Sequence, residues 1–260
     1  QSLFEQRELR VHPQKDDKIL TDWNGLMISA MARAAQVLHD EKLENASVKA
    51  MDFILSHLID EDGNLVKRYR NGVSGIHATV EDYAFVIWGL MEVYELTFDV
   101  KYLKKAVELS DYQLAHFWDV TTGGFYFTSD ESEELLVRVK EAYDGAIPSG
   151  NSVSAMNFLK LGRMLSRPDY EVISTQIFNA FSTQLNRSSS GFSQMLQAID
   201  FSQGPTFEIL IAGKIDDDRT IRLINEIRSV FLPNAVMILV DPNDTELISW
   251  LPHLQYYHES

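Results

Sequence analysis

Apolar side chains recur at helical spacing in six stretches of this chain, and the stretches fall into three consecutive pairs. Each pair is short enough, and its connection tight enough, to form an antiparallel helical hairpin. The predicted helices span residues 24–38 and 43–58, 80–96 and 101–117, and 152–165 and 170–185. This repetition predicts a mainly α-helical fold built from one repeated unit.

The two helices of a pair differ in character. Residues 80–96 are apolar almost all round, which is typical of a helix buried on most faces. Residues 101–117 carry a single apolar stripe, with lysines and acidic residues on the other face, which is typical of an outer helix. Alternating inner and outer helices predict a curved or closed array of αα-hairpins.

A glycine turn follows the second helix of each pair, at Gly63, Gly124 and Gly191. An extended segment comes after each of these glycines. Residues 65–69 and 125–128 have the composition of short strands, and the second would pair with 135–139 in a short β-hairpin loop.

The C-terminal part of the chain breaks the repeat. Residues 206–212 and 235–240 read as buried strands, and 217–231 reads as an amphipathic helix between them. Strand, crossover helix and strand predict a small parallel βαβ unit, and a helical turn is expected near 245–251. We therefore expect a toroid portion over residues 1–204, with a small α/β unit packed on it over residues 205–260.

Net charge, cysteine content and the length of apolar runs exclude several classes of binding partner and location. The formal net charge of −15 argues against nucleic acid, because binding phosphates requires clustered lysine and arginine. The chain has no cysteine, which excludes disulfides and thiolate chemistry and fits a reducing, cytoplasmic location. No apolar run approaches membrane-spanning length. The chain begins in a polar, helical-looking stretch, which suggests a fragment of a longer protein.

Three polar segments, residues 15–25, 77–83 and 144–152, stand at or just before the first helix of each pair. First helices of an antiparallel array all point the same way, so these segments are expected to gather on one rim. Helix N-termini present free N–H groups and a positive dipole end there. Such a rim suits a polar, hydroxyl-rich ligand.

Candidate functional residues come from these three segments. Carboxylates and an imidazole can transfer protons, while aromatic, amide and hydroxyl groups can bind a sugar. The candidates for catalysis are His77, Glu81 and Asp82, and those for substrate binding are Asp17, Asp22, Trp23, Asn24, Tyr83, Ser149 and Asn151.

A structural alternative stands beside each of these roles. Asp22, Asn24, Thr79 and Ser152 are residue types preferred as helix N-caps, and Thr79 with Asp82 resembles a capping box. His77 and Glu81 lie four residues apart, but two ligands are too few for a dedicated metal site. No metal and no cofactor is therefore expected.

The stretches HPQKDDKILTDWNGLMISAMARAA, VEDYAFVIWGLMEVYELTFD and YDGAIPSGNSVSAMNFLKLGRM resemble the C-terminal region of the spermatogenesis-associated protein 20-like family. The resemblance implies an (α/α) toroid similar to six-hairpin glycosidases and N-acylglucosamine 2-epimerases, joined to an N-terminal thioredoxin-like domain. It implies that this chain carries part of the toroid, without the thioredoxin-like domain and the earlier hairpins. A further segment containing a cysteine would follow Ser260.

Two functions follow as alternatives. The first is a carbohydrate-related domain that binds or processes a sugar. The second is a non-catalytic scaffold or interaction domain of a thioredoxin-like redox protein. The scaffold alternative predicts that the polar groups of the rim satisfy one another.

Overall fold

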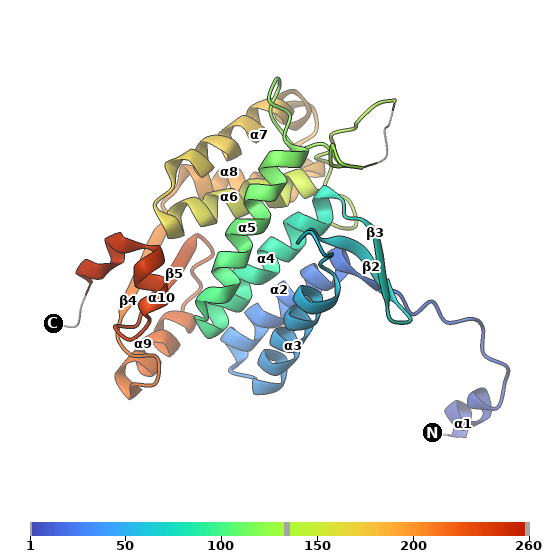
Figure 1. Ribbon diagram of the computed structural model, residues 1–260, viewed down its shortest axis with the longest axis horizontal. Helices are drawn as coiled ribbons and strands as arrows, with labels where there is room; N and C mark the ends of the chain where they lie inside the picture. The colour runs from blue at the N-terminus through green and yellow to red at the C-terminus, as the bar shows by residue number, and fades with distance from the viewer. Residues whose placement is uncertain (1, 133–135, 258–260) are drawn as a thin grey trace.

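The computed structural model describes residues 2–132 and 136–257, and its body is an array of helical hairpins (Figure 1). The helices pair as predicted, with α2 (Thr21–Leu38) and α3 (Glu41–His57), α4 (Val80–Thr97) and α5 (Val100–Phe117), and α6 (Gly150–Leu165) and α7 (Pro168–Arg187). A short helix, α1 (Ser2–Glu8), lies away from this body at the end of an extended segment. The mainly α prediction of an (α/α) hairpin toroid portion is confirmed.

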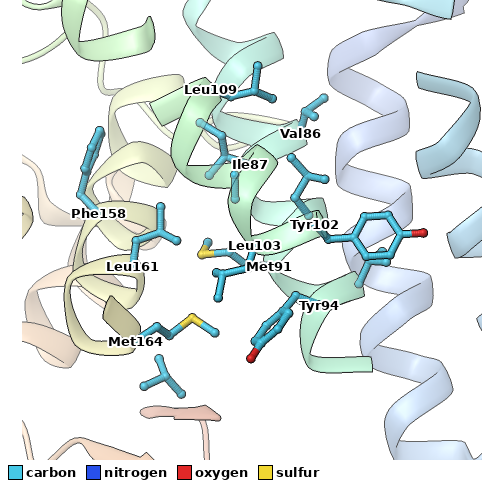
Figure 2. Packing of buried hydrophobic residues seen from close by; sticks show 14 of the residues in the cluster. Val86, Ile87, Met91, Tyr94, Tyr102, Leu103, Leu109, Phe158, Leu161 and Met164 are labelled. Carbon is cyan, nitrogen blue, oxygen red and sulfur yellow. The ribbon is translucent and has the colours of Figure 1, made fainter. Parts of the chain in front are cut away.

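Helix α4 is the central inner helix and contacts α2, α5 and α6. Its side chains meet those of α5 and α6 in the main hydrophobic core, as Figure 2 shows for Ile87, Leu103 and Leu161. Outer helix α5 buries only one stripe and leaves its lysines towards solvent. The predicted contrast between inner and outer helices is therefore present.

Inner helices α2 and α4 approach each other very closely at Gly25. A Cβ atom at this position would lie 2.6 Å from the backbone carbon of Phe85. Contact of this kind is open only to glycine, because any side chain would push the two helices apart. Gly25 thus sets how near the N-terminal ends of α2 and α4 lie to each other.

The connection between the first two hairpins contributes β2 (Val66–Arg70) and β3 (Val73–His77) to a three-stranded antiparallel sheet. Its third strand is β1 (Ile19–Leu20), just before α2, and the order is β1-β2-β3. Strand β3 was not predicted. Its turn has Asn71 and Gly72 at positive φ, the Asn-Gly pattern of a tight hairpin. His77 therefore ends a strand and does not lie on the first turn of a helix.

The strand predicted over residues 125–128 does not form, which corrects the sequence analysis. Phe125 makes only an isolated bridge to Trp118, and the Phe127 N–H donates to the Val139 carbonyl at 2.8 Å. Gly123 and Gly124 both have positive φ, so the chain turns too tightly here for a regular ladder. Residue 135, the start of the predicted partner strand, lies outside the described residues.

The third glycine turn also differs from its prediction, because it leads into helix α8 (Ser193–Gln203) after a 3-10 turn at Ser189–Gly191. One Oδ of Asp144 accepts hydrogen bonds from the backbone N–H groups of Gln194 and Met195, at 2.8 and 3.2 Å. An aspartate from a distant loop thus caps this helix, which local sequence could not indicate.

The C-terminal part contains the predicted βαβ unit. Strand β4 (Phe207–Ala212) pairs in parallel with β5 (Ala235–Val240), and α9 (Asp218–Arg228) connects them. Helix α10 (Thr245–Trp250) and a 3-10 turn at Pro252–Tyr256 follow. The hydrophobic core runs without a break from the inner helices into β5. Within the described ranges, no helix has the length and apolar character needed to cross a membrane.

Candidate functional site

The N-terminal ends of the three inner helices meet, as the sequence predicts. The Asp22 backbone N–H on α2 donates to Asp82 Oδ1 on α4 at 3.0 Å. Gly150, which begins α6, is so close to α4 that a Cβ would lie 2.7 Å from Val80 Cγ1. We call the surface formed by these three helix ends the rim.

A buried ion pair organises the rim. Lys67 Nζ on β2 donates to Asp22 Oδ2 at 2.6 Å and to Asp82 Oδ1 at 3.2 Å. Burial lowers the pKa of the Lys67 ammonium, but the Asp82 and Asp22 carboxylates outweigh that effect and raise it overall. Sequence reasoning missed Lys67, because the antiparallel pairing of β2 brings it to the rim and no motif marks it.

Asp82 has a structural role in the rim. Its Oδ2 accepts from the Thr79 backbone N–H at 2.7 Å and from the Thr79 hydroxyl at 2.8 Å, which completes the predicted capping box. The side chain is fully buried. Burial raises the pKa of Asp82 to about 6, although Lys67 and the Thr79 donors act in the opposite direction.

Glu81, the next residue along the chain, is placed differently. In the part of the chain that the structure describes, no group forms a hydrogen bond or ion pair with its carboxylate. Burial is the largest influence and raises the pKa of Glu81 to about 6, the neighbouring carboxylates add to the rise, and Lys67 opposes it. A half-buried carboxyl with this pKa can exchange a proton near neutral pH.

Three of the other candidates are exposed to different degrees around the rim. Trp23 is 62% exposed, and His77 is exposed at the end of β3. Asp17 lies outside the ion pair and accepts from Arg70 Nε at 2.7 Å. Asn24 is inside α2 and does not cap it, because its Nδ2 donates to the Leu20 carbonyl at 2.7 Å.

Tyr83, Ser149 and Asn151 are buried, so they support the rim from beneath. The Tyr83 hydroxyl accepts from the Leu65 N–H at 3.1 Å. Ser149 caps α6 through the Ser152 N–H at 3.1 Å. Asn151 exchanges two hydrogen bonds with the backbone of Phe125 and thereby replaces a missing strand neighbour. None of these three side chains offers surface to a ligand.

A groove of about 380 Å³ runs between α2 and α4, along their faces opposite the outer helices. Trp88 and Glu92 of α4 and Arg33 of α2 line it, together with small and apolar residues of α2. We call this feature the inner groove. Glu81 lies two helical turns before Trp88 at heptad spacing, so both occupy the same face of α4.

Glu92 is the most unusual group of the inner groove. Its Oε1 accepts from Trp88 Nε1 at 3.3 Å and from Lys160 Nζ at 3.2 Å. Its Oε2 is buried and accepts no hydrogen bond from any described residue, and Arg33 Nη1 lies 3.9 Å away. Sequence reasoning missed Glu92, although an acidic residue within an otherwise apolar inner helix was a visible signal.

The arrangement can bind a neutral polar molecule and transfer a proton at the rim. The inner groove offers an indole face and a buried carboxylate acceptor, and Glu81 lies on the same face of α4, two helical turns before Trp88. Residues 2–132 and 136–257 contain no group of three or more histidine, aspartate or glutamate side chains placed to hold a metal ion.

Sequence comparison finds relatives of the whole chain. Human spermatogenesis-associated protein 20 is 33% identical over 259 residues, which cover 96% of this chain and 33% of that protein. The mouse protein of the same name is 32% identical over 261 residues. This chain is therefore homologous to these proteins and spans about a third of their length. No protein-family model matches the sequence.

Solved structures of an alpha-mannanase and of a cellobiose 2-epimerase share this fold. A GH76 alpha-mannanase from Bacteroides thetaiotaomicron aligns with a TM-score of 0.59 and 14% identity, over 84% of this chain and 59% of its own. Cellobiose 2-epimerase from Bacillus thermoamylovorans aligns with a TM-score of 0.58 and 14% identity, over 84% and 61%. At this identity the likeness establishes the toroid fold alone.

Proposed function

Because the chain is homologous to spermatogenesis-associated protein 20 over nearly its whole length, we propose that it belongs to that family and binds a carbohydrate in the inner groove. The unpartnered Glu92 Oε2 beside the half-buried Trp88 indole carries this proposal. A buried acceptor without a donor costs free energy that a ligand hydroxyl can recover. An indole face suits the apolar face of a sugar ring.

Charge and size support a neutral saccharide. The chain carries a net charge of −15, which disfavours anionic sugars. Glu81 and Trp88 are separated by two helical turns, about 10 Å along the axis, which is roughly the length of two sugar rings. A disaccharide stacked on Trp88 would therefore reach Glu81.

Glu81 is the proposed proton-transfer residue of this site. Its pKa of about 6 places it between acid and base near neutral pH, which general acid–base catalysis requires. We assign Asp22, Asp82 and Lys67 to holding the rim in place, because their charged groups bind one another. Trp23 and Asn24 would border the open end of the groove.

The remainder of the longer protein would complete this site. We propose that the earlier hairpins close the toroid over the inner groove and that a thioredoxin-like domain precedes them. The absence of cysteine is consistent with a cytoplasmic location. The groove lies between α2 and α4, and both helices belong to this chain, so its binding of sugar can be tested directly.

The test is calorimetric titration of the 260-residue chain with cellobiose and mannobiose. We expect one of them to bind in the millimolar range or tighter, and Trp88→Leu to abolish binding. Trp250→Leu is the matched control, because Trp250 is also half-buried but lies on α10 outside the groove. Glu81→Gln should keep binding and lose any conversion of the bound sugar.

Two results would reject the proposal. One is the absence of binding by either disaccharide at tens of millimolar, and the other is equal binding by the Trp88→Leu variant. The scaffold function would then account better for a rim whose carboxylates are engaged by Lys67 and Thr79.

A further inference from the structure

A second cavity, of about 360 Å³, lies at the other end of the inner helices from the rim. It opens between the helical array and the C-terminal α/β unit, with walls from α2, α4, β4, the end of α9 and the turn after it, and β5. Most of the wall is apolar: Val37, Ile209, Ile227, Val230, Phe231, Leu232, Ala235, Val236 and Met237. This junction cavity has the size of a small-molecule site.

Two polar atoms of the junction cavity lack partners. Gln36 is 2% exposed; its Nε2 donates to the Glu92 carbonyl at 3.1 Å, and its Oε1 has no hydrogen-bond partner among the described residues. Arg228 donates through Nη2 to the carbonyls of Glu95 and Leu96, while its buried Nε is likewise unpartnered within the described ranges. One acceptor and one donor therefore stay unused in an apolar enclosure, at a cost in free energy.

The charged groups of the cavity are held by other groups of the chain. Arg33 Nη1 lies 3.6 Å from Glu95 Oε2, and Glu95 Oε1 accepts from the Met237 N–H at 3.2 Å. The Arg228 guanidinium is held by the two carbonyls at the end of α4. An anionic ligand would lie beside Glu95, and a cationic ligand would lie beside Arg33 and Arg228. An ion of either sign would therefore meet a like charge in a largely apolar cavity, which is unfavourable.

We propose that the junction cavity binds an uncharged amphipathic molecule, whose alkyl body fills the apolar enclosure and whose single amide or hydroxyl group donates to Gln36 Oε1 and accepts from Arg228 Nε. A primary amide has both functions in one group. The cavity borders the inner groove, with which it shares Arg33 and Val37, and it lies between the inner helices and the α/β unit.

The probe is octanamide, with octanoate and octylammonium as charged analogues of the same length, titrated calorimetrically into the 260-residue chain. Octanamide should bind with a Kd of about 1 mM or tighter, which its ten heavy atoms readily allow. Both ions should bind at least about tenfold more weakly, because each would meet a like charge among Arg33, Glu95 and Arg228.

Gln36→Met keeps the side-chain length and removes the unused acceptor, so octanamide should bind about fivefold more weakly. Gln113→Met is the matched control. Gln113 is also buried, its Nε2 donates to Ser154 Oγ at 2.7 Å and its Oε1 is unpartnered among the described residues, but it does not line the cavity. Its variant should bind octanamide as the original chain does.

The proposal is overturned if octanamide does not bind below about 10 mM. It is also overturned if octanoate or octylammonium binds as well as octanamide, or if Gln36→Met and Gln113→Met have equal effects. Circular dichroism of each variant verifies that the helices are intact, so a loss of binding reports on the cavity.

Discussion

Replacing Glu81 by glutamine tests whether Glu81 serves proton transfer or stabilises the fold. The two roles predict opposite changes in the free energy of unfolding. The pKa of Glu81 is raised from 4.5 to about 6 in the folded chain, chiefly by burial. A carboxyl with a raised folded pKa stabilises the fold below its unfolded pKa and loses that contribution as pH rises through its folded pKa. Ionised Glu81 therefore destabilises the fold at neutral pH.

The size of the effect follows from the shift. A rise of about 1.5 pKa units corresponds to about 2 kcal/mol, and partial solvent exposure reduces this to about 1 kcal/mol. Glutamine is neutral at every pH and has nearly the same shape. The Glu81→Gln variant should thus be more stable than the original chain by about 1 kcal/mol near pH 7.5, and equally stable near pH 4.

Urea unfolding at the two pH values measures this difference. Glu61→Gln provides the control, since Glu61 is an exposed carboxyl of the turn before β2. The reasoning fails if Glu81→Gln is less stable than the original chain near pH 7.5, or if its advantage is the same at both pH values. If the Glu81→Gln variant is more stable but no longer converts the sugar, Glu81 is a residue that serves catalysis and destabilises the fold.

Three further changes test the rim and the helix contact. Lys67→Met leaves two buried carboxylates without their cation and should lower the free energy of unfolding by about 3 kcal/mol in urea titration; a loss below about 1 kcal/mol would contradict the buried ion pair. Gly25→Ala forces a Cβ into the backbone of Phe85 and should cost about 2 kcal/mol despite better helix propensity, so an unchanged Tm would refute the close approach. Asn151→Ala removes three hydrogen bonds to loop backbone and should cost about 2–3 kcal/mol, visible as a lower Tm and faster amide exchange at Phe125.

The hairpin array was predictable because the periodicity of a helix depends only on residues that are close together in the sequence. Residues 80–96 are apolar on most faces and residues 101–117 have a single apolar stripe, so the existence and the layer of these two helices follow from spacing alone. The start of α2 was placed three residues late, because Asn24 looks like a cap. In the structure it lies inside the helix and Leu20 occupies the N-cap position.

The parts that were missed depend on contacts between distant segments. Helix α8 is capped by Asp144, and the loop at Phe125 is held by Asn151, so neither conformation is determined by nearby residues. The rim itself was predicted from the common direction of the inner helices. Lys67 at its centre was not, since only the pairing of β2 with its neighbours brings this lysine there.

The inner groove could not be found from sequence motifs. Trp88 and Glu92 lie on an inner helix whose apolar character points to burial, and the groove exists only because α2 leaves one face of α4 open. That Glu92 Oε2 accepts no hydrogen bond from a described residue follows only from the three-dimensional positions of the surrounding donors.

A crystal structure of the chain grown with cellobiose or mannobiose shows whether the inner groove holds the sugar. We expect density for a sugar ring stacked on the Trp88 indole, with a hydroxyl within hydrogen-bond distance of Glu92 Oε2. Density for the sugar elsewhere on the molecule, with an empty inner groove, would contradict it.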